Sequence, residues 1–276
     1  MTSSEAPVGE ATVTQRLLDL ALTRGERRAL AAGPDGECYS YAELAATVQS
    51  AAAGLAWRGV QPRDIVGVYV PDAVSYVLAT HAIRAAGGVP TPVAASLTVQ
   101  EIAGQLAECG ARMLLTAPPL AAAALAAADR SWVRQVISFG EAAGAIPFSS
   151  LLRLGSLRPA SARSHDMALL PYARRPDGSL GRAALTHIDF AAELARLAAE
   201  AGITERDVVL AAPPAGDGGA YTTFVDNALI RGATIVAART DEMAAAAGAH
   251  HGTAVIVPPG TDVGASELLR VFAVAS

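Results

Sequence analysis

The stretch from Leu169 to His187 reads LLPYARRPDGSLGRAALTH, and the rest of the chain is organised around it. Its pattern predicts a strand, then a loop, then the start of a helix. At such a place an α/β protein that binds nucleotides uses small Gly, Ser and Thr residues plus one Lys, because only a slim backbone lets N–H groups close around phosphate oxygens. This loop instead carries bulk and charge, at Arg174, Arg175, Pro176 and Asp177.

The composition is that of a globular protein. The chain has 276 residues, of which 52% are hydrophobic, enough for one large α/β domain or two smaller lobes. The most apolar stretch, 117–128, contains two prolines and is too short to span a bilayer. Residues 1–13 lack the basic and apolar parts of a secretory signal, so we expect a flexible tail, a cytoplasmic protein and no membrane partner.

The charged and metal-binding residue types exclude several functions. A net charge of −5 without any basic run argues against nucleic acid as a partner. All 21 basic side chains are Arg, which excludes a lysine Schiff base or a lysine clamp on phosphate. Cys38 and Cys109 lack metal spacing and are expected to be free and inert. His250 and His251 fit a helix C-terminus better than a metal site, and no metal is expected.

Short apolar strands alternate with helices along the chain. A Pro-Asp-Gly turn predicts a hairpin of 28–32 with 37–40, and Ser40 with Glu43 and Thr98 with Glu101 form capping boxes that open helices. Further strands are expected at 65–70, 112–116, 133–139, 166–172, 208–212, 233–237, 253–257 and 268–275.

This alternation predicts an α/β fold with two doubly wound, mostly parallel sheets and flanking helices. We expect a first lobe at 14–165, which ends in a connector at 149–164, and a second lobe at 166–276 that contains the loop at 172–184.

Several of these segments resemble the adenylate-forming (AMP-binding) family of acyl-CoA synthetases and peptide-synthetase adenylation domains. The quoted stretch matches, without a gap, that family's phosphate loop, close to LLPYSSGTTGLPKGVMLTH. The segments YSYAEL at 39–44, GVQPRDIV at 59–66, LIRGATIV at 229–236 and AVIVPP at 254–259 resemble the family's LTYAEL, GV-x-x-GD-x-V, LRAGATVV and VVPP segments. The resemblance implies the fold of the family's N-terminal domain without its C-terminal domain.

The match places this chain's residues on the family's phosphate-binding positions. The family's first loop Gly falls on Arg175, its two Thr fall on Pro176 and Asp177, and its Lys falls on Gly181. The frame is therefore kept and the chemistry lost, so we expect no bound cofactor at the degenerate loop, whose residues are Tyr172, Arg174, Arg175, Asp177, Gly178, Gly181, Arg182 and Thr186.

Other family features are absent from these 276 residues. They are the segments that the resemblance assigns to adenine, Mg²⁺ and ribose, and the C-terminal domain with its catalytic Lys. The chain is also shorter than the family between Pro259 and Glu267, where a helix helps to wall the acyl pocket. Without these groups the charge on a pentavalent phosphate would not be stabilised. We therefore expect adenylation activity to be lost.

A few residues remain candidates for a role. Arg174, Arg175 and Arg182 could replace a lysine, although a solvated loop is the expected outcome. Thr186 is expected to cap a helix, and His187 is not expected to be catalytic. Asp217, where a family histidine falls, and Tyr221 are weak catalytic candidates; a turn is the simpler reading of Asp217 and its glycines. Asp166, Asp177 and Asp217 form no recognisable carboxylate pair.

Two functions remain open from the sequence. One is a non-adenylating binding or docking component in acyl, polyketide or other secondary-metabolite assembly. The other is an enzyme: a repurposed cleft between the lobes acting on an acyl thioester or a carrier-bound acyl group, or half a ligase completed by another chain. A buried, acyl-sized pocket beside Asp217 would favour the enzyme. Expected partners are a second copy of the chain, a larger synthase or acyl carrier protein, and an acyl ligand, because the last expected strand leaves an apolar edge.

Overall fold

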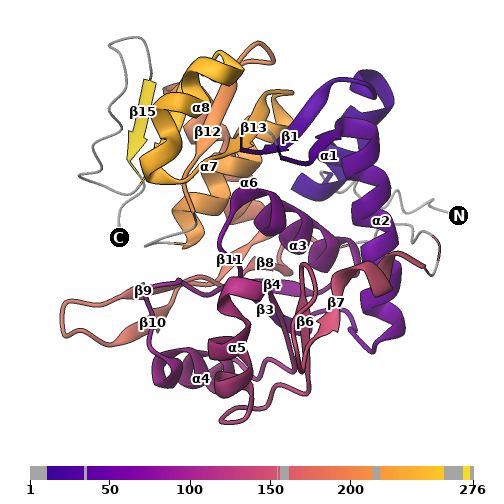
Figure 1. The fold of residues 1–276 in the computed structure, drawn as a ribbon, viewed down its shortest axis with the longest axis vertical. Coiled ribbons are helices and arrows are strands. Elements are labelled where there is room, and N and C mark those ends of the chain that lie inside the picture. The colour runs from indigo at the N-terminus through magenta and orange to yellow at the C-terminus, as the bar shows by residue number, and fades with distance from the viewer. Residues whose placement is uncertain are drawn as a thin grey trace, which may run out of the picture.

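Two mostly parallel sheets form the framework of the protein (Figure 1). The computed structural model describes residues 11–33, 36–153, 155, 162–213, 218–257 and 270–273. In this part of the chain the six-stranded sheet has the order β15 (Arg270–Ala273), β14 (Ala254–Val257), β12 (Val208–Ala211), β13 (Thr234–Ala237), β1 (Arg28–Ala32) and β2 (Cys38–Ser40). The five-stranded sheet has the order β4 (Val89–Pro92), β3 (Ile65–Tyr69), β5 (Met113–Thr116), β6 (Gln135–Ser138) and β7 (Ile146–Pro147).

All neighbouring strands in these two sheets pair in parallel except β1 and β2, which form the predicted hairpin. The strands are short and rich in Val, Ile, Leu and Ala, as strands buried on both faces require. The predicted α/β fold with mostly parallel sheets and flanking helices is confirmed.

Helices connect the strands and cover the sheets. The described helices are α1 (Val13–Arg24), α2 (Tyr41–Trp57), α3 (Ala73–Ala85), α4 (Val99–Glu108), α5 (Ala121–Ala128), α6 (His187–Ala201), α7 (Gly218–Ile230) and α8 (Met243–His250), with short 3₁₀ turns at Pro118–Leu120, Phe148–Arg153 and Thr240–Glu242. None of the helices described here combines the length and hydropathy that a membrane-spanning segment needs.

Capping boxes mark where four of the described helices begin. The predicted capping boxes are present at Ser40 for α2 and at Thr98 for α4. Thr12 opens α1 in the same way, so the predicted tail ends slightly before residue 13. Thr186 caps α6, as predicted. Each cap gives a side-chain acceptor to a backbone N–H that the helix itself cannot satisfy.

Helix α3 lies between the two sheets and is buried along its whole length (Figure 1). It contacts β1 and β13 on one side and β3 and β4 on the other. Side chains from both sheets, such as Val68 and Ile235, belong with α3 to one hydrophobic cluster. The two sheets therefore share a core.

The sheets do not follow the predicted division of the chain at residue 165. Strands β1 and β2 come from the predicted first lobe, yet β1 pairs with β13 in register Leu30 with Ile235. Helix α2 follows β2 and carries the chain across to the five-stranded sheet, contacting α3 on the way. The prediction followed the order of the chain, and that order does not show which distant strands become neighbours in a sheet.

The central stretch also differs from the prediction. The prediction was one strand at 166–172 followed by a loop. The chain instead forms β8 (Met167–Leu169) and then β9 (Tyr172–Arg174), which pairs antiparallel with β10 (Leu180–Arg182). Strand β11 (Leu185–Thr186) follows and pairs antiparallel with β8. Pro171 lies between β8 and β9. The connector predicted at 149–164 begins in a 3₁₀ turn, and its residues 154 and 156–161 lie outside the described residues.

Candidate functional site

The hairpin of β9 and β10 projects from the body of the protein at the lower left of Figure 1. Its base is held by β4: the Leu170 N–H donates to the Pro90 carbonyl oxygen over 3.0 Å, and the Thr91 hydroxyl donates to the Leu170 carbonyl oxygen over 2.7 Å. Tyr172 is buried at this base against Val89. The stretch that resembles a phosphate loop in sequence is thus a hairpin anchored at one end.

The turn of the hairpin uses its own backbone donors. The Arg175 N–H donates to the Ser179 carbonyl oxygen over 2.8 Å, and the Gly178 N–H donates to the Arg175 carbonyl oxygen over 2.9 Å. The Ser179 N–H and hydroxyl both donate to Asp177 Oδ1, over 2.9 and 2.6 Å. Gly178 takes a φ of +83°, which glycine tolerates without strain. A phosphate-binding loop needs free N–H groups that converge on one space. The N–H groups of Arg175, Gly178 and Ser179 are instead bonded within the turn.

The arginines of the hairpin lie at its surface, and two of them pair with α4. Arg174 Nη2 lies 2.9 Å from Glu101 Oε1, while its Nη1 donates to the Gly178 carbonyl oxygen over 2.8 Å. Arg182 Nε lies 3.9 Å from Glu108 Oε1. The side chains of Arg174 and Arg182 remain 49% and 59% exposed. The predicted solvated loop is therefore only partly correct, because these guanidiniums are directed to α4.

Arg175 covers Gly181, the position on which the sequence resemblance places a lysine. A Cβ atom built on Gly181 would lie 2.3 Å from Arg175 Nε and 2.6 Å from its Cζ. The guanidinium thus lies directly against the Gly181 backbone, on the neighbouring strand. A longer side chain at this position would have to displace it.

The carboxylates around the hairpin are held in their charged form. The Thr98 N–H, followed by the Arg174 guanidinium, lowers the pKa of Glu101 to about 2. Hydrogen bonds from the Ser179 hydroxyl and N–H lower the pKa of Asp177. Hydrogen bonds to the charged form of a carboxyl group stabilise that form, so these two groups are ionised near neutral pH and have no proton to donate. On this surface the carboxylates therefore act as acceptors for the hairpin and the helix cap.

Thr186 and His187 stand at the start of α6 with separate roles. The Thr186 hydroxyl accepts from the Asp189 N–H over 3.3 Å and donates to Asp189 Oδ2 over 2.6 Å. Burial, followed by the charge of Arg84, lowers the pKa of His187. His187 lines a pocket beside Met167, at the start of β8 and away from the hairpin turn. The prediction that Thr186 is an N-cap is confirmed.

Of the two weak catalytic candidates, the structure describes only Tyr221. Tyr221 is 2% exposed, and its hydroxyl donates to the Ala212 carbonyl oxygen over 2.8 Å. Its ring meets that of Tyr76 edge to face, with centroids 5.2 Å apart, and burial raises its pKa far above the usual range. These contacts give Tyr221 a place in the core. Asp217 lies outside the described residues, as does the segment 258–269 with the predicted shortening.

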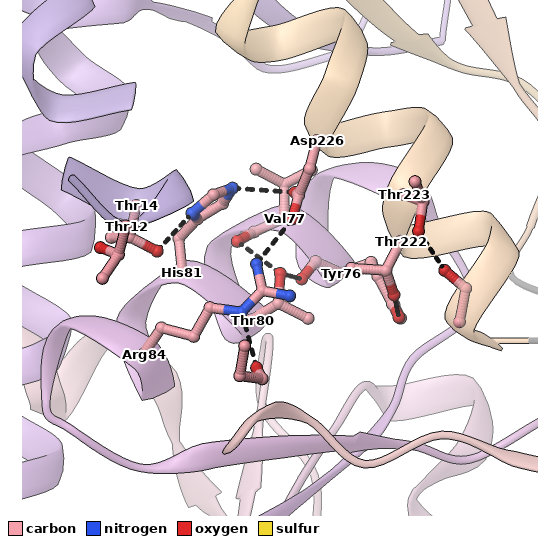
Figure 2. Close-up of polar contacts among 12 residues, drawn as sticks. Thr12, Thr14, Tyr76, Val77, Thr80, His81, Arg84, Thr222, Thr223 and Asp226 are labelled. Atoms are coloured by element: carbon pink, nitrogen blue, oxygen red, sulfur yellow. Dashed lines mark hydrogen bonds and ion pairs between the residues drawn. The ribbon is translucent and has the colours of Figure 1, made fainter. Parts of the chain in front are cut away.

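A buried polar cluster joins α1, α3 and α7 (Figure 2). The Thr14 hydroxyl lies 2.9 Å from His81 Nδ1, and His81 Nε2 lies 3.1 Å from Asp226 Oδ1. Arg84 Nη1 donates to Asp226 Oδ2 over 2.6 Å. Burial alone would raise the pKa of Asp226, but Arg84 and His81 outweigh it and lower that pKa.

The order hydroxyl, imidazole, carboxylate in this cluster is that of a hydrolytic triad. Thr14, His81 and Asp226 are only 2%, 0% and 1% exposed, so no substrate can reach the hydroxyl. The cluster therefore fixes three helices to one another. Sequence reasoning missed it, although the signal that could have found it is the pair His81 and Arg84, one turn apart in a helix with no other ionisable side chain except Tyr76.

The remaining predicted residues take structural places. His250 ends α8 and its Nε2 lies 3.0 Å from the Gly33 carbonyl oxygen, and His251 follows it. The described residues contain no group of three His, Cys, Asp or Glu side chains that could hold a metal ion. Cys38 and Cys109 are free, and burial raises the pKa of the Cys109 thiol. Asp166 and Asp177 lie at different sites, one on Arg63 and one in the hairpin turn.

Comparison with known proteins places this arrangement in a family. The sequence pattern of the AMP-binding enzyme family matches residues 19–260. The chain is 30% identical over 209 residues to 4-coumarate–CoA ligase 5 from Oryza sativa subsp. japonica, covering 73% of this chain and 38% of that protein. It is 32% identical over 128 residues to the hybrid PKS-NRPS synthetase pynA of Aspergillus niger, covering 46% of this chain and 3% of that protein.

Solved structures agree with the sequence comparison. Apo MbtA from Mycobacterium smegmatis matches with a TM-score of 0.82 and 26% identity, over 91% of this chain and 49% of that one. The N-terminal domain of FACL13 from Mycobacterium tuberculosis shares the fold, with a TM-score of 0.78 and 18% identity over 91% of this chain and 63% of that one. The chain thus spans less than two thirds of the length of these relatives. It belongs to the AMP-binding enzyme family and has the fold of the N-terminal domain of its acyl-CoA ligases.

Proposed function

We propose that this chain is a non-adenylating member of the AMP-binding family that serves as a binding or docking component in acyl, polyketide or other secondary-metabolite assembly. The observation that carries the proposal is the closed hairpin at 172–182. Its turn satisfies the N–H groups of Arg175, Gly178 and Ser179 internally, and the Arg175 guanidinium covers Gly181. A phosphate needs free donors that converge and a cation beside them.

Three further observations support the proposal. Lysine is absent from the whole chain, so no lysine can replace the one lost from the loop. Tyr221 is engaged in the core and is a poor acid or base, which weakens the alternative of a repurposed catalytic cleft. Similarity to the synthetase pynA and to tyrocidine synthase 3 of Brevibacillus parabrevis supports a setting in multienzyme assembly. The proposed partners are a second copy, a larger synthase or an acyl carrier protein, with an acyl group as possible ligand.

Calorimetry with Mg-ATP tests the loss of nucleotide binding. We expect no micromolar binding and no carboxylate-dependent exchange of pyrophosphate into ATP. A matched variant restores the family residues through Arg175→Gly, Pro176→Thr, Asp177→Thr and Gly181→Lys, and it should bind Mg-ATP at least about tenfold more tightly than the unchanged chain. Micromolar binding of Mg-ATP by the unchanged chain would refute the proposal. If the restored variant gains no affinity for Mg-ATP, the hairpin is not the cause of the lost binding.

Co-purification from the native host, followed by mass spectrometry, tests the docking role. We expect a synthase or an acyl carrier protein to be retained. Turnover of an acyl thioester by the purified chain, or pyrophosphate exchange that appears only with a second polypeptide, would instead support the enzyme alternatives.

A further inference from the structure

The pocket that His187 lines lies at the opposite end of β8 from the hairpin. Its volume is about 450 Å³, within the range of roughly 300–1,000 Å³ typical of small-molecule sites. It is formed where β3, β4 and β8 begin and where α3 ends and α6 starts. Its charged and polar lining consists of Arg63, Arg84, Arg163, Asp166 and His187.

Arg63 reaches this pocket from an unusual backbone conformation. Its φ is +73°, in the left-handed region that side chains other than glycine rarely adopt. The family segment GV-x-x-GD-x-V has a glycine at this place. Residues held in such conformations cluster at ligand sites, because the surrounding structure must impose them. Here the backbone places the guanidinium on Asp166, with Nε and Nη2 donating to Oδ1 over 3.1 and 2.7 Å.

The charge of Asp166 is offset by that of Arg63, with which it forms an ion pair. Its Oδ1 accepts both bonds from Arg63, and its Oδ2 accepts from the Arg163 N–H over 2.9 Å. This backbone bond, followed by the Arg63 guanidinium, lowers the pKa of Asp166. The Arg163 side chain forms no ion pair within the described part of the chain and is exposed. The positive charge of Arg163 is therefore not offset by a carboxylate among the described residues.

Arg84 supplies a second incomplete cation. It is 7% exposed, and its Nη1 and Nε donate to Asp226 and to the Ala168 carbonyl oxygen (Figure 2). Its Nη2 is buried and has no hydrogen-bond partner among the described residues. A buried donor without a partner is rare in folded proteins and calls for an explanation such as a bound ion.

Counted together, three guanidiniums face two carboxylates, Asp166 in the pocket and Asp226 behind it, so one positive charge is in excess. Guanidinium groups bind phosphate oxygens through paired N–H donors. We propose that this pocket binds a small phosphate-bearing molecule, with Arg63 and Arg163 at its mouth as the contacting groups and the buried Arg84 guanidinium adding positive charge behind its wall. The proposal does not depend on the proposed function, because the hairpin takes no part in it.

Inorganic phosphate is the probe, titrated by calorimetry into the full chain at constant ionic strength, with acetate as a planar monoanion for comparison. We expect saturable binding of phosphate and weaker binding of acetate. Arg163→Gln and Arg63→Gly should each weaken phosphate binding about tenfold, the loss of one charge-assisted contact. Arg63→Gly also relieves the left-handed backbone, so the variant should fold, as an unchanged thermal midpoint would confirm.

Two controls separate the pocket from general charge. Arg130→Gln removes an exposed arginine outside the pocket, and Arg175→Ser removes one from the hairpin; both should leave phosphate binding unchanged. The imidazole resonances of His187 should shift on addition of phosphate, since His187 lines the pocket. Absence of saturable binding would overturn the proposal. So would an equal loss of affinity in Arg130→Gln or Arg175→Ser, or a His187 signal that does not respond.

Discussion

Arg174 Nη2 and Glu101 Oε1 lie 2.9 Å apart and join the hairpin to the first turn of α4. The same carboxylate accepts from the Thr98 N–H over 2.9 Å, so one side chain both caps a helix and receives the loop. The pair is exposed, with side-chain exposures of 49% and 32%. It positions the hairpin without burying a charge.

The pKa of Glu101 reports on this contact. Its value of about 2 in the folded chain lies below the ordinary 4.5, so the charged form is favoured by folding. The stabilisation is therefore present above about pH 4.5 and is lost as the pH falls toward 2. Arg174→Gln should raise this pKa only in part, because the Thr98 N–H remains. Titration followed by NMR measures it, and Arg196→Gln on α6 should leave it unchanged; a pKa that ignores Arg174→Gln would contradict the pairing.

Removing the hairpin arginines should hardly change stability. The double variant Arg174→Ser with Arg175→Gly deletes one exposed ion pair, and such pairs contribute about 0–1 kcal/mol. The free energy of unfolding from urea denaturation should thus fall by less than about 1 kcal/mol. A loss of several kcal/mol would mean that these arginines support the fold, and the hairpin would then not be an independent surface element.

Asp226→Asn should be strongly destabilising. The substitution leaves the Arg84 guanidinium in the core without its counter-ion, which costs about 3–5 kcal/mol. Because Arg84 and His81 hold the pKa of Asp226 below its usual value, this stabilisation is present at neutral pH and is lost as acid lowers the pH through the folded value. Arg239→Gln, which breaks an exposed pair with Asp241, is the matched control and should cost less than about 1 kcal/mol. Equal effects in urea denaturation would argue against a structural role of the buried cluster.

The proposed docking role predicts self-association or a stable complex. Strand β15 is the edge of the six-stranded sheet in the described residues, and Val271 on it is 52% exposed. An apolar edge strand is a template for pairing with another chain. Light scattering after size exclusion, at low micromolar concentration and again in moderate salt, should give a mass above that of one chain. A monodisperse monomer that also retains nothing from the native host would count against docking.

Local signals in the sequence were sufficient for much of the fold. Ser40 with Glu43 and Thr98 with Glu101 mark helix starts because a cap needs only residues three apart. The hairpin of β1 and β2 was predicted from the Pro-Asp-Gly sequence between them, and apolar runs such as 208–211 marked buried strands. The family segments pointed to the same fold and to the loss of loop chemistry at Arg175 and Gly181.

Other features depended on contacts between distant residues. The pairing of Leu30 with Ile235 joins residues 205 positions apart, and no local pattern determines which strands become neighbours. Arg174 reaches Glu101 only because β4 holds the base of the hairpin beside α4, so the loop could not be recognised as a paired hairpin from its own residues.

The sequence by itself thus determined the α/β class and most elements outside the central stretch, since these depend on side chains close together in the chain, and it predicted a changed chemistry for the central loop. Only the tertiary structure decided the route of the sheets, the Thr14, His81 and Asp226 cluster, and the pocket of Arg63, Arg84 and Arg163. Those features require residues from different elements to meet, and in the buried cluster the absence of water between the groups then strengthens their interaction.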